Sequence, residues 1–112
     1  MDVPLFAKIT CVAPVIVVES RRAGLSPALV LAVIQIESRG YNFAASRVGA
    51  LGLMQLRPVT AEARRTGGRW RGHATLFDPV ANVRLGVSYL ERAGAARDGD
   101  LPPTVLRGLS AI

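Results

Sequence analysis

Residues 27–58 read PALVLAVIQIESRGYNFAASRVGALGLMQLRP, an apolar run that passes into a loop rich in Gly, Ser and Ala. The run predicts a helix, because Ser26 is a favourable N-cap, Pro27 suits the first helical position and Gly40 follows the end. Apolar residues lie nearly all round this helix. We therefore expect the helix from Ser26 to Ser38 to be central and buried.

This helix ends on a single acidic residue, Glu37. Leu29, Val33 and Glu37 follow one another at intervals of four, which places the carboxylate on the extension of an apolar stripe. Apolar surroundings raise the pKa of a carboxyl, so that it can hold a proton and act as a general acid, as in glycosidic bond cleavage. Taken alone, a Glu beside Ser38 and Arg39 is more commonly a solvated or ion-paired surface residue.

Other helices are predicted on both sides of this segment. One runs through 15–23, with Pro14 in its first turn and Gly24 at its end, and a shorter one covers 58–66. A last helix starts at Pro79 after the cap Asp78. Its apolar face contains Val80, Val83, Val87 and Leu90. No segment alternates long enough to require a sheet, so the predicted class is mainly α.

Length and composition limit the function classes. A chain of 112 residues that is 50% hydrophobic predicts one domain over residues 1–112. The net charge of +6 favours anionic partners: nucleic acid, acidic lipid or an anionic cell-wall polymer. Cys11 and His73 are each the only residue of their type, which gives little support to a zinc site or a Cys/His nucleophile. The apolar residues 3–18 are too short and interrupted to span a bilayer, and Asp2 before them does not suit a signal peptide.

Two blocks of the sequence carry a dense motif. The first contains Glu37-Ser38, Ala45-Ser46, Gly49-Ala50, Gly52-Leu53-Met54-Gln55, Pro58 and Thr60-Ala61. The second contains Asp78-Pro79, Asn82, Gly86 and Tyr89-Leu90. In residues and spacing, both resemble the family 1 lytic transglycosylase domain, the soluble-lytic-transglycosylase (SLT) type. The resemblance covers about residues 12–100 and implies a single goose-type-lysozyme-like domain.

The resemblance also implies a chemistry. Glu37 falls on the family's single catalytic acid, which protonates the oxygen between N-acetylmuramic acid (MurNAc) and N-acetylglucosamine (GlcNAc). Attack by the muramoyl C6 hydroxyl then gives a 1,6-anhydro product, and neither a metal nor a cofactor is implied. The positions that match the sugar groove or lie near the acid are Ser38, Ser46, Met54 and Gln55. From the residues alone, Met54 is equally a core filler and the serines are caps or turn residues.

Four further positions and one tryptophan receive weaker predictions. Tyr89 and Asn82 are predicted to pack and hydrogen-bond, while Gly49 and Gly52 would let the backbone approach a sugar closely. Trp70 lies between two arginines and suits either stacking on a ligand or covering the core edge.

The last segment departs from the family pattern. Residues 101–112, LPPTVLRGLSAI, contain neither Tyr nor Asn where the family has Ala-Tyr-Asn, whose Tyr sits beside the catalytic acid. We therefore expect a divergent or truncated end and reduced activity.

Two other functions stay open: a catalytically impaired glycan-binding relative and a small basic helical DNA-binding module. The resemblance favours peptidoglycan glycan strands as partner over nucleic acid, in a periplasmic or cell-envelope location. We expect a monomer and leave open a role in a larger envelope or secretion assembly.

Overall fold

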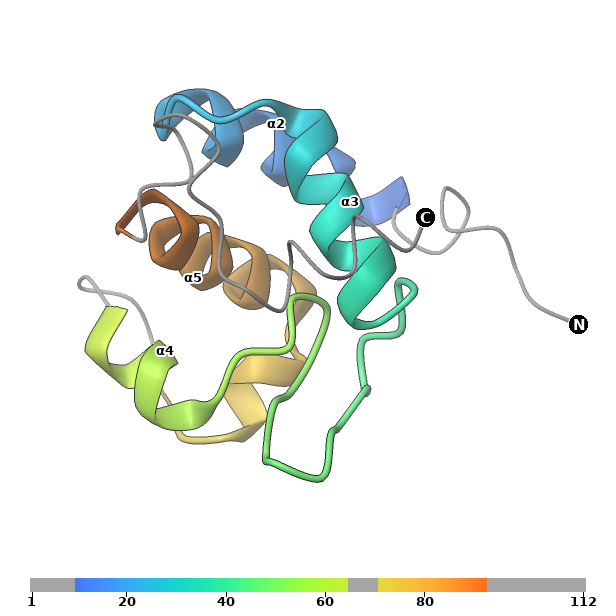
Figure 1. Ribbon diagram of the computed structural model, residues 1–112, viewed down its shortest axis with the longest axis vertical. Helices are drawn as coiled ribbons and strands as arrows, with labels where there is room; N and C mark the ends of the chain where they lie inside the picture. The colour runs from blue at the N-terminus through green and yellow to red at the C-terminus, as the bar shows by residue number, and fades with distance from the viewer. Residues whose placement is uncertain (1–9, 65–70, 93–112) are drawn as a thin grey trace, which may run out of the picture.

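This computed structural model describes residues 10–64 and 71–92, which contain six helical elements (Figure 1). They are η1 Thr10–Val12, α2 Ala13–Arg22, α3 Pro27–Glu37, α4 Pro58–Arg64, η2 Ala74–Phe77 and α5 Pro79–Arg92. Within these residues the only β-pairing is isolated bridges, such as Leu51 with Leu56. The mainly α class is thus confirmed. The predictions for residues 1–9, Trp70 and residues 101–112 lie outside the described residues.

The starts of α3 and α5 and the end of α2 lie where the predicted capping residues place them. The Ser26 hydroxyl accepts a hydrogen bond from the Ala28 amide at 3.2 Å, and the Asp78 carboxylate accepts one from the Val80 amide at 2.9 Å. Gly24 has a φ of +74° just after α2. A left-handed residue at that position ends a helix, and glycine adopts it without strain.

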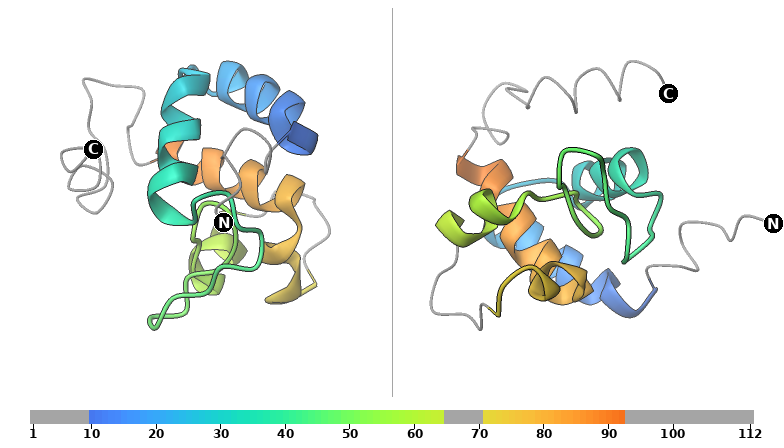
Figure 2. Two further views of the ribbon diagram at one scale, coloured as in Figure 1. Left: turned by 90° about the vertical axis from the view of Figure 1, so that its right-hand side faces the viewer. Right: turned by 90° about the horizontal axis from the view of Figure 1, so that it is seen from below.

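One hydrophobic cluster joins α2, α3 and α5 with the segment before α4. The predicted face of α5 is confirmed, because Val83, Val87 and Leu90 are buried and Val80 packs at the edge of the cluster. Residues from the other elements complete it: Val12, Ile16, Ala23, Leu25, Val30, Val33, Ile34, Leu53 and Met54. In the views of Figures 1 and 2, α5 lies between the α2/α3 pair and α4.

The prediction that α3 is buried all round is wrong. Only Val30, Val33 and Ile34 are fully buried, whereas Gln35 is exposed and Ile36 is half-buried. The reason is geometric, since the core cluster meets α3 along one side and leaves the other side of this apolar helix only partly covered. The C-terminal end of α3 therefore lies at the edge of the core rather than at its centre.

The long loop from Ser38 to Arg57 connects α3 to α4 and is held against the second half of the chain. Phe43 stacks on Phe77 of η2 with ring centroids 5.7 Å apart. A second small cluster, made of Leu56, Ala61 and Leu76, packs the end of the loop and α4 against η2. Among the described helices, none is both long and apolar enough to cross a membrane.

Candidate active site

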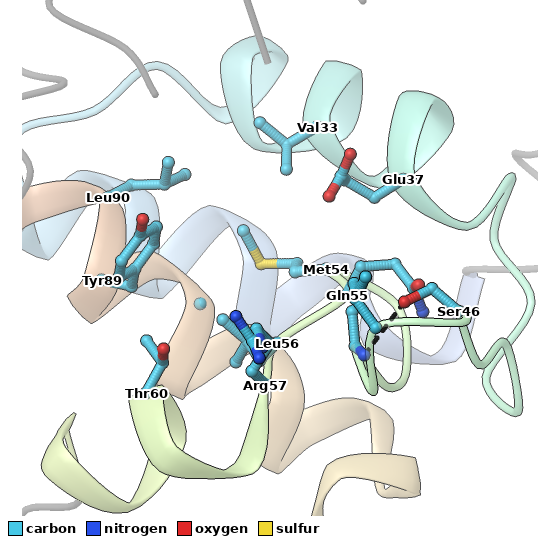
Figure 3. A pocket seen from close by; sticks show the side chains of 13 residues that line it. Val33, Glu37, Ser46, Met54, Gln55, Leu56, Arg57, Thr60, Tyr89 and Leu90 are labelled. Atoms are coloured by element: carbon cyan, nitrogen blue, oxygen red, sulfur yellow. Dashed lines mark hydrogen bonds between the residues drawn. The ribbon is translucent and has the colours of Figure 1, made fainter. Parts of the chain in front are cut away.

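A pocket of about 390 Å³ opens between the end of α3, the 46–57 loop, the start of α4 and one face of α5 (Figure 3). Its polar lining residues are Glu37, Ser46, Gln55, Arg57, Thr60 and Tyr89. The remainder are Val33, Val48, Ala50, Met54, Leu56, Gly86 and Leu90. The pocket thus gathers four of the predicted site residues, namely Glu37, Ser46, Met54 and Gln55, from two separate elements.

Glu37 is the last residue of α3, and its carboxyl group points into the pocket toward Met54 (Figure 3). The side chain is half-buried, and this burial raises the pKa of Glu37 above its ordinary value. Among the described residues, no hydrogen bond or ion pair reaches the carboxylate. A carboxyl group in this state is suited to holding a proton and giving it to a ligand in the pocket.

Ser38 does not line the pocket, although it follows Glu37 directly. Its hydroxyl donates to the Ile34 carbonyl at 3.2 Å and accepts from the Gly40 amide at 3.2 Å. These bonds cap the end of α3, where Arg39 and Gly40 both have positive φ angles of 53° and 82°. The geometry therefore gives Ser38 the capping role that the sequence left open, and it acts on the position of Glu37 through the backbone.

Ser46 and Gln55 belong to the loop that follows α3. Their side chains form hydrogen bonds with the backbone of that loop. The Ser46 hydroxyl accepts from the Ala50 amide at 3.0 Å. The Gln55 side-chain nitrogen donates to the carbonyls of Ala44 and Gly52, both at 3.0 Å. Gln55 also has a φ of 51°, which is rare outside glycine. Since the amide hydrogens are used on the loop, the amide oxygen is the part of Gln55 available to a ligand.

Asn82 anchors the segment that precedes Gln55. It is fully buried, accepts from the Met54 amide at 2.8 Å, and donates to the carbonyls of Leu51 and Leu76 at 3.0 and 2.9 Å. The predicted hydrogen-bonding role of Asn82 is therefore confirmed. Gly52 sits so close that a Cβ there would overlap the Leu76 carbonyl oxygen and the Asn82 side chain. The glycine is needed for this interior contact, which differs from the predicted approach to a sugar.

Three polar pocket residues were not predicted as site residues: Tyr89, Arg57 and Thr60. Tyr89 was predicted to pack and hydrogen-bond, and it is 36% exposed and lines the pocket. Gly86, Tyr89 and Leu90 follow an i, i+3, i+4 pattern, so they share the face of α5 that borders the pocket. That spacing in the sequence could have indicated that Tyr89 lies on the pocket face. Gly86 also leaves room for the Met54 side chain, which a Cβ at this position would overlap.

The comparison with protein families identifies this arrangement. The model of the transglycosylase SLT domain matches residues 14–105, and the chain therefore belongs to this family. Among curated proteins, it is 42% identical over 73 residues to the endo-type membrane-bound lytic murein transglycosylase A of Klebsiella pneumoniae. It is 39% identical over 75 residues to the membrane-bound lytic murein transglycosylase C of Cronobacter sakazakii. These matches cover 60% and 63% of this chain but only 35% and 21% of the two relatives.

Solved structures agree with this family assignment. An inactive mutant of the lytic transglycosylase Slt from Pseudomonas aeruginosa superposes with a TM-score of 0.69 at 34% identity. The 70 kDa soluble lytic transglycosylase of Escherichia coli gives 0.60 at 27% identity. Each match covers 77% of this chain, and it covers 14% and 16% of the respective larger proteins. The chain thus has the SLT fold, and it corresponds to a small part of each of these enzymes.

Proposed function

We propose that this domain is a peptidoglycan lytic transglycosylase that cleaves the β-1,4 bond between MurNAc and GlcNAc, with Glu37 as its acid. The observation that supports this most directly is the Glu37 carboxyl, half-buried in the pocket without a bonding partner among the described residues. It is the only carboxylic acid among the described residues that line the pocket. A mechanism that uses one carboxyl group twice therefore suits the site better than a two-carboxylate hydrolysis.

In the first step Glu37 acts as general acid. Its raised pKa favours the protonated carboxyl, which gives its proton to the glycosidic oxygen as the bond from this oxygen to the MurNAc anomeric carbon breaks. The leaving sugar departs as an alcohol, and the positive charge that develops on the MurNAc ring lies near the newly formed carboxylate. Attraction between these charges stabilises the transition state.

In the second step Glu37 acts as general base. The C6 hydroxyl of the same MurNAc attacks its anomeric carbon, and Glu37 takes up the hydroxyl proton. The product is a 1,6-anhydromuramoyl end, and the enzyme regains its proton without consuming water. Apolar lining residues such as Val33, Met54 and Leu90 would favour this outcome by excluding water from the reacting carbon.

The remaining predicted site residues take binding and positioning roles in this proposal. The amide oxygen of Gln55 is available to accept hydrogen bonds from sugar hydroxyl or acetamido groups, and the Met54 side chain provides an apolar surface for a sugar face. Ser46 lies in the pocket wall, while Ser38 holds the helix end that carries Glu37. The substrate is peptidoglycan, and the place of action is the cell envelope.

Substitution of the acid tests the proposal. Glu37→Gln keeps the size of the side chain but cannot deliver a proton, so activity should fall at least about 100-fold. Glu62→Gln is the matched control, because Glu62 is exposed on α4 and does not line the pocket. The assay is digestion of purified peptidoglycan followed by mass spectrometry, in which anhydro ends mark a transglycosylase and reducing ends mark a hydrolase.

Each outcome of this assay has a definite meaning. Anhydro products that disappear in Glu37→Gln and persist in Glu62→Gln would support the proposal. Undiminished activity in Glu37→Gln would reject Glu37 as the acid. A wild-type chain that binds glycan strands without cleaving them would favour the glycan-binding alternative, and salt-sensitive binding to duplex DNA instead would favour the DNA-binding one.

A further inference from the structure

Arg57 is a pocket residue whose charge the proposed chemistry does not use. It directly precedes α4, and its carbonyl accepts a hydrogen bond from the Ala61 amide at 3.0 Å, which ties its backbone to the first turn of that helix. The side chain is exposed and lines the pocket. Figure 3 shows Glu37 on one side of the pocket and Arg57 and Thr60 across from it.

The guanidinium of Arg57 has no acidic partner among the described residues. The ion pairs found there join Arg22 to Glu19 and Glu91, and neither of these acids lines the pocket. Glu37, the only acid of the described lining, forms no ion pair with Arg57. A cation fixed beside a concave site and left unpaired is available to an anionic group of a ligand.

The pocket therefore has two chemically different ends. Glu37 provides a proton donor at one end, and in Figure 3 the apolar Met54 side chain lies between it and Arg57. The other end combines the Arg57 charge with the hydroxyl groups of Thr60 and Tyr89. A neutral oligosaccharide would use the hydroxyls but would leave the positive charge unmatched, whereas a carboxylate on the sugar would satisfy both.

We propose that Arg57 is a specificity residue that binds a carboxylate of the substrate, carried on the 3-O-lactyl group of MurNAc or on the peptide attached to it. This inference rests on the proposed function, because it assumes a glycan in the pocket. The planar guanidinium can bind both carboxylate oxygens at once, which makes such a contact stronger and more directional than a neutral hydrogen bond. The site would thereby favour muramoyl glycans over GlcNAc oligomers, which have no carboxylate.

Binding measurements in a Glu37→Gln background test this without turnover. The ligands are a GlcNAc-MurNAc-peptide, the peptide-free disaccharide with its free lactyl carboxylate, and a GlcNAc disaccharide. Arg57→Gln removes the charge, and Arg57→Lys retains it without the fork of donors. Arg84→Gln is the matched control, since Arg84 is exposed on α5 and lies outside the pocket lining.

We expect Arg57→Gln to weaken binding of carboxylate-bearing ligands about 10-fold or more and to leave the GlcNAc disaccharide unchanged. Arg57→Lys should restore part of the loss, and Arg84→Gln should change little. The lactyl carboxyl is an amide in the peptide-bearing ligand. A loss with the peptide-free disaccharide therefore identifies the lactyl carboxylate as a partner, and a loss with the peptide-bearing ligand identifies a peptide carboxylate.

Several results would overturn the inference. These are an equal loss in Arg57→Gln and Arg84→Gln, an equal loss for the GlcNAc disaccharide, or no binding of any muramoyl ligand. The proposed function fails separately, when wild-type protein releases no anhydro products from peptidoglycan. An inactive protein whose Arg57 still selects carboxylates would retain this inference as a property of a glycan-binding domain.

Discussion

The two sides of the pocket are held in opposite ways. On one side, Asn82 makes three hydrogen bonds to the Leu51–Met54 segment and η2, and Gln55 makes two more to the loop. On the other side, the Glu37 carboxyl has no bonding partner among the described residues. The helix end beneath it is nevertheless fixed by the Ser38 hydroxyl.

This difference separates positioning from reactivity. A hydrogen bond to the ionised form of Glu37 would lower its pKa, while a partially buried carboxyl with no such bond keeps a raised one. The backbone around the acid is therefore ordered by its neighbours, and the acid itself is left to exchange its proton. The loop across the pocket from Glu37 takes no part in proton transfer, so its polar side chains can be used in hydrogen bonds that hold its shape.

On the hydrogen-bonded loop side of the pocket, substitution of Gly52 should have the largest effect on stability. Gly52→Ala should destabilise the fold by about 3 to 4 kcal/mol, because it adds left-handed strain and overlaps interior atoms. Gly49→Ala is the matched variant, since Gly49 also has a positive φ but has nothing within 4 Å of a Cβ. It should cost only about 1 kcal/mol. Chemical denaturation measures both, and equal costs would show that backbone strain alone, rather than crowding, requires Gly52.

Asn82→Ala should have the next largest effect. It removes three hydrogen bonds of a buried side chain at about 1 kcal/mol each, so we expect a loss of about 2 to 3 kcal/mol of folding free energy. Ser26→Ala removes a single helix cap elsewhere and should cost about 1 kcal/mol. Hydrogen exchange at the Met54 amide should accelerate more in Asn82→Ala than in Ser26→Ala. Unchanged protection of that amide would mean that Asn82 does not hold the pocket loop.

Local signals in the sequence were sufficient for the helices. Ser26, Asp78 and Gly24 mark helix ends through backbone hydrogen bonds that involve only nearby residues, so their patterns could be recognised without the fold. The gathering of Glu37, Ser46, Met54 and Gln55 at one pocket was implied by the family motif. Composition and helical periodicity alone would have left Glu37 as a surface residue.

Three features that depend on packing between distant elements were not predicted. The exposure of one side of α3 follows from where the core cluster meets it, and its apolar sequence gave no sign of this. Tyr89 was predicted to have a structural packing role, yet it lines the pocket. The need for Gly52 arises from Asn82 and Leu76, both of which follow it by more than twenty residues.

The smallest predicted effect concerns the side of the pocket that carries Glu37, where Glu37→Gln should make the folding free energy less dependent on pH. Well below the ordinary pKa of 4.5, Glu37 is protonated in both the folded and the unfolded chain, and its ionisation costs nothing. As the pH rises from that value through the raised folded pKa, the unfolded chain releases the proton first and binds fewer protons than the folded one, so stability falls. Above the raised pKa the full cost of the partly buried charge is present. The neutral Gln side chain avoids this cost, although solvent around the half-exposed group should keep the difference in folding free energy below about 1 kcal/mol.

Thermal unfolding of wild type, Glu37→Gln and the exposed-site control Glu62→Gln should therefore show a gain in stability for Glu37→Gln that grows from acidic to neutral pH. A gain that shrinks as the pH rises would mean that the ionised carboxylate is stabilised in the fold, and would contradict the use of Glu37 as a general acid.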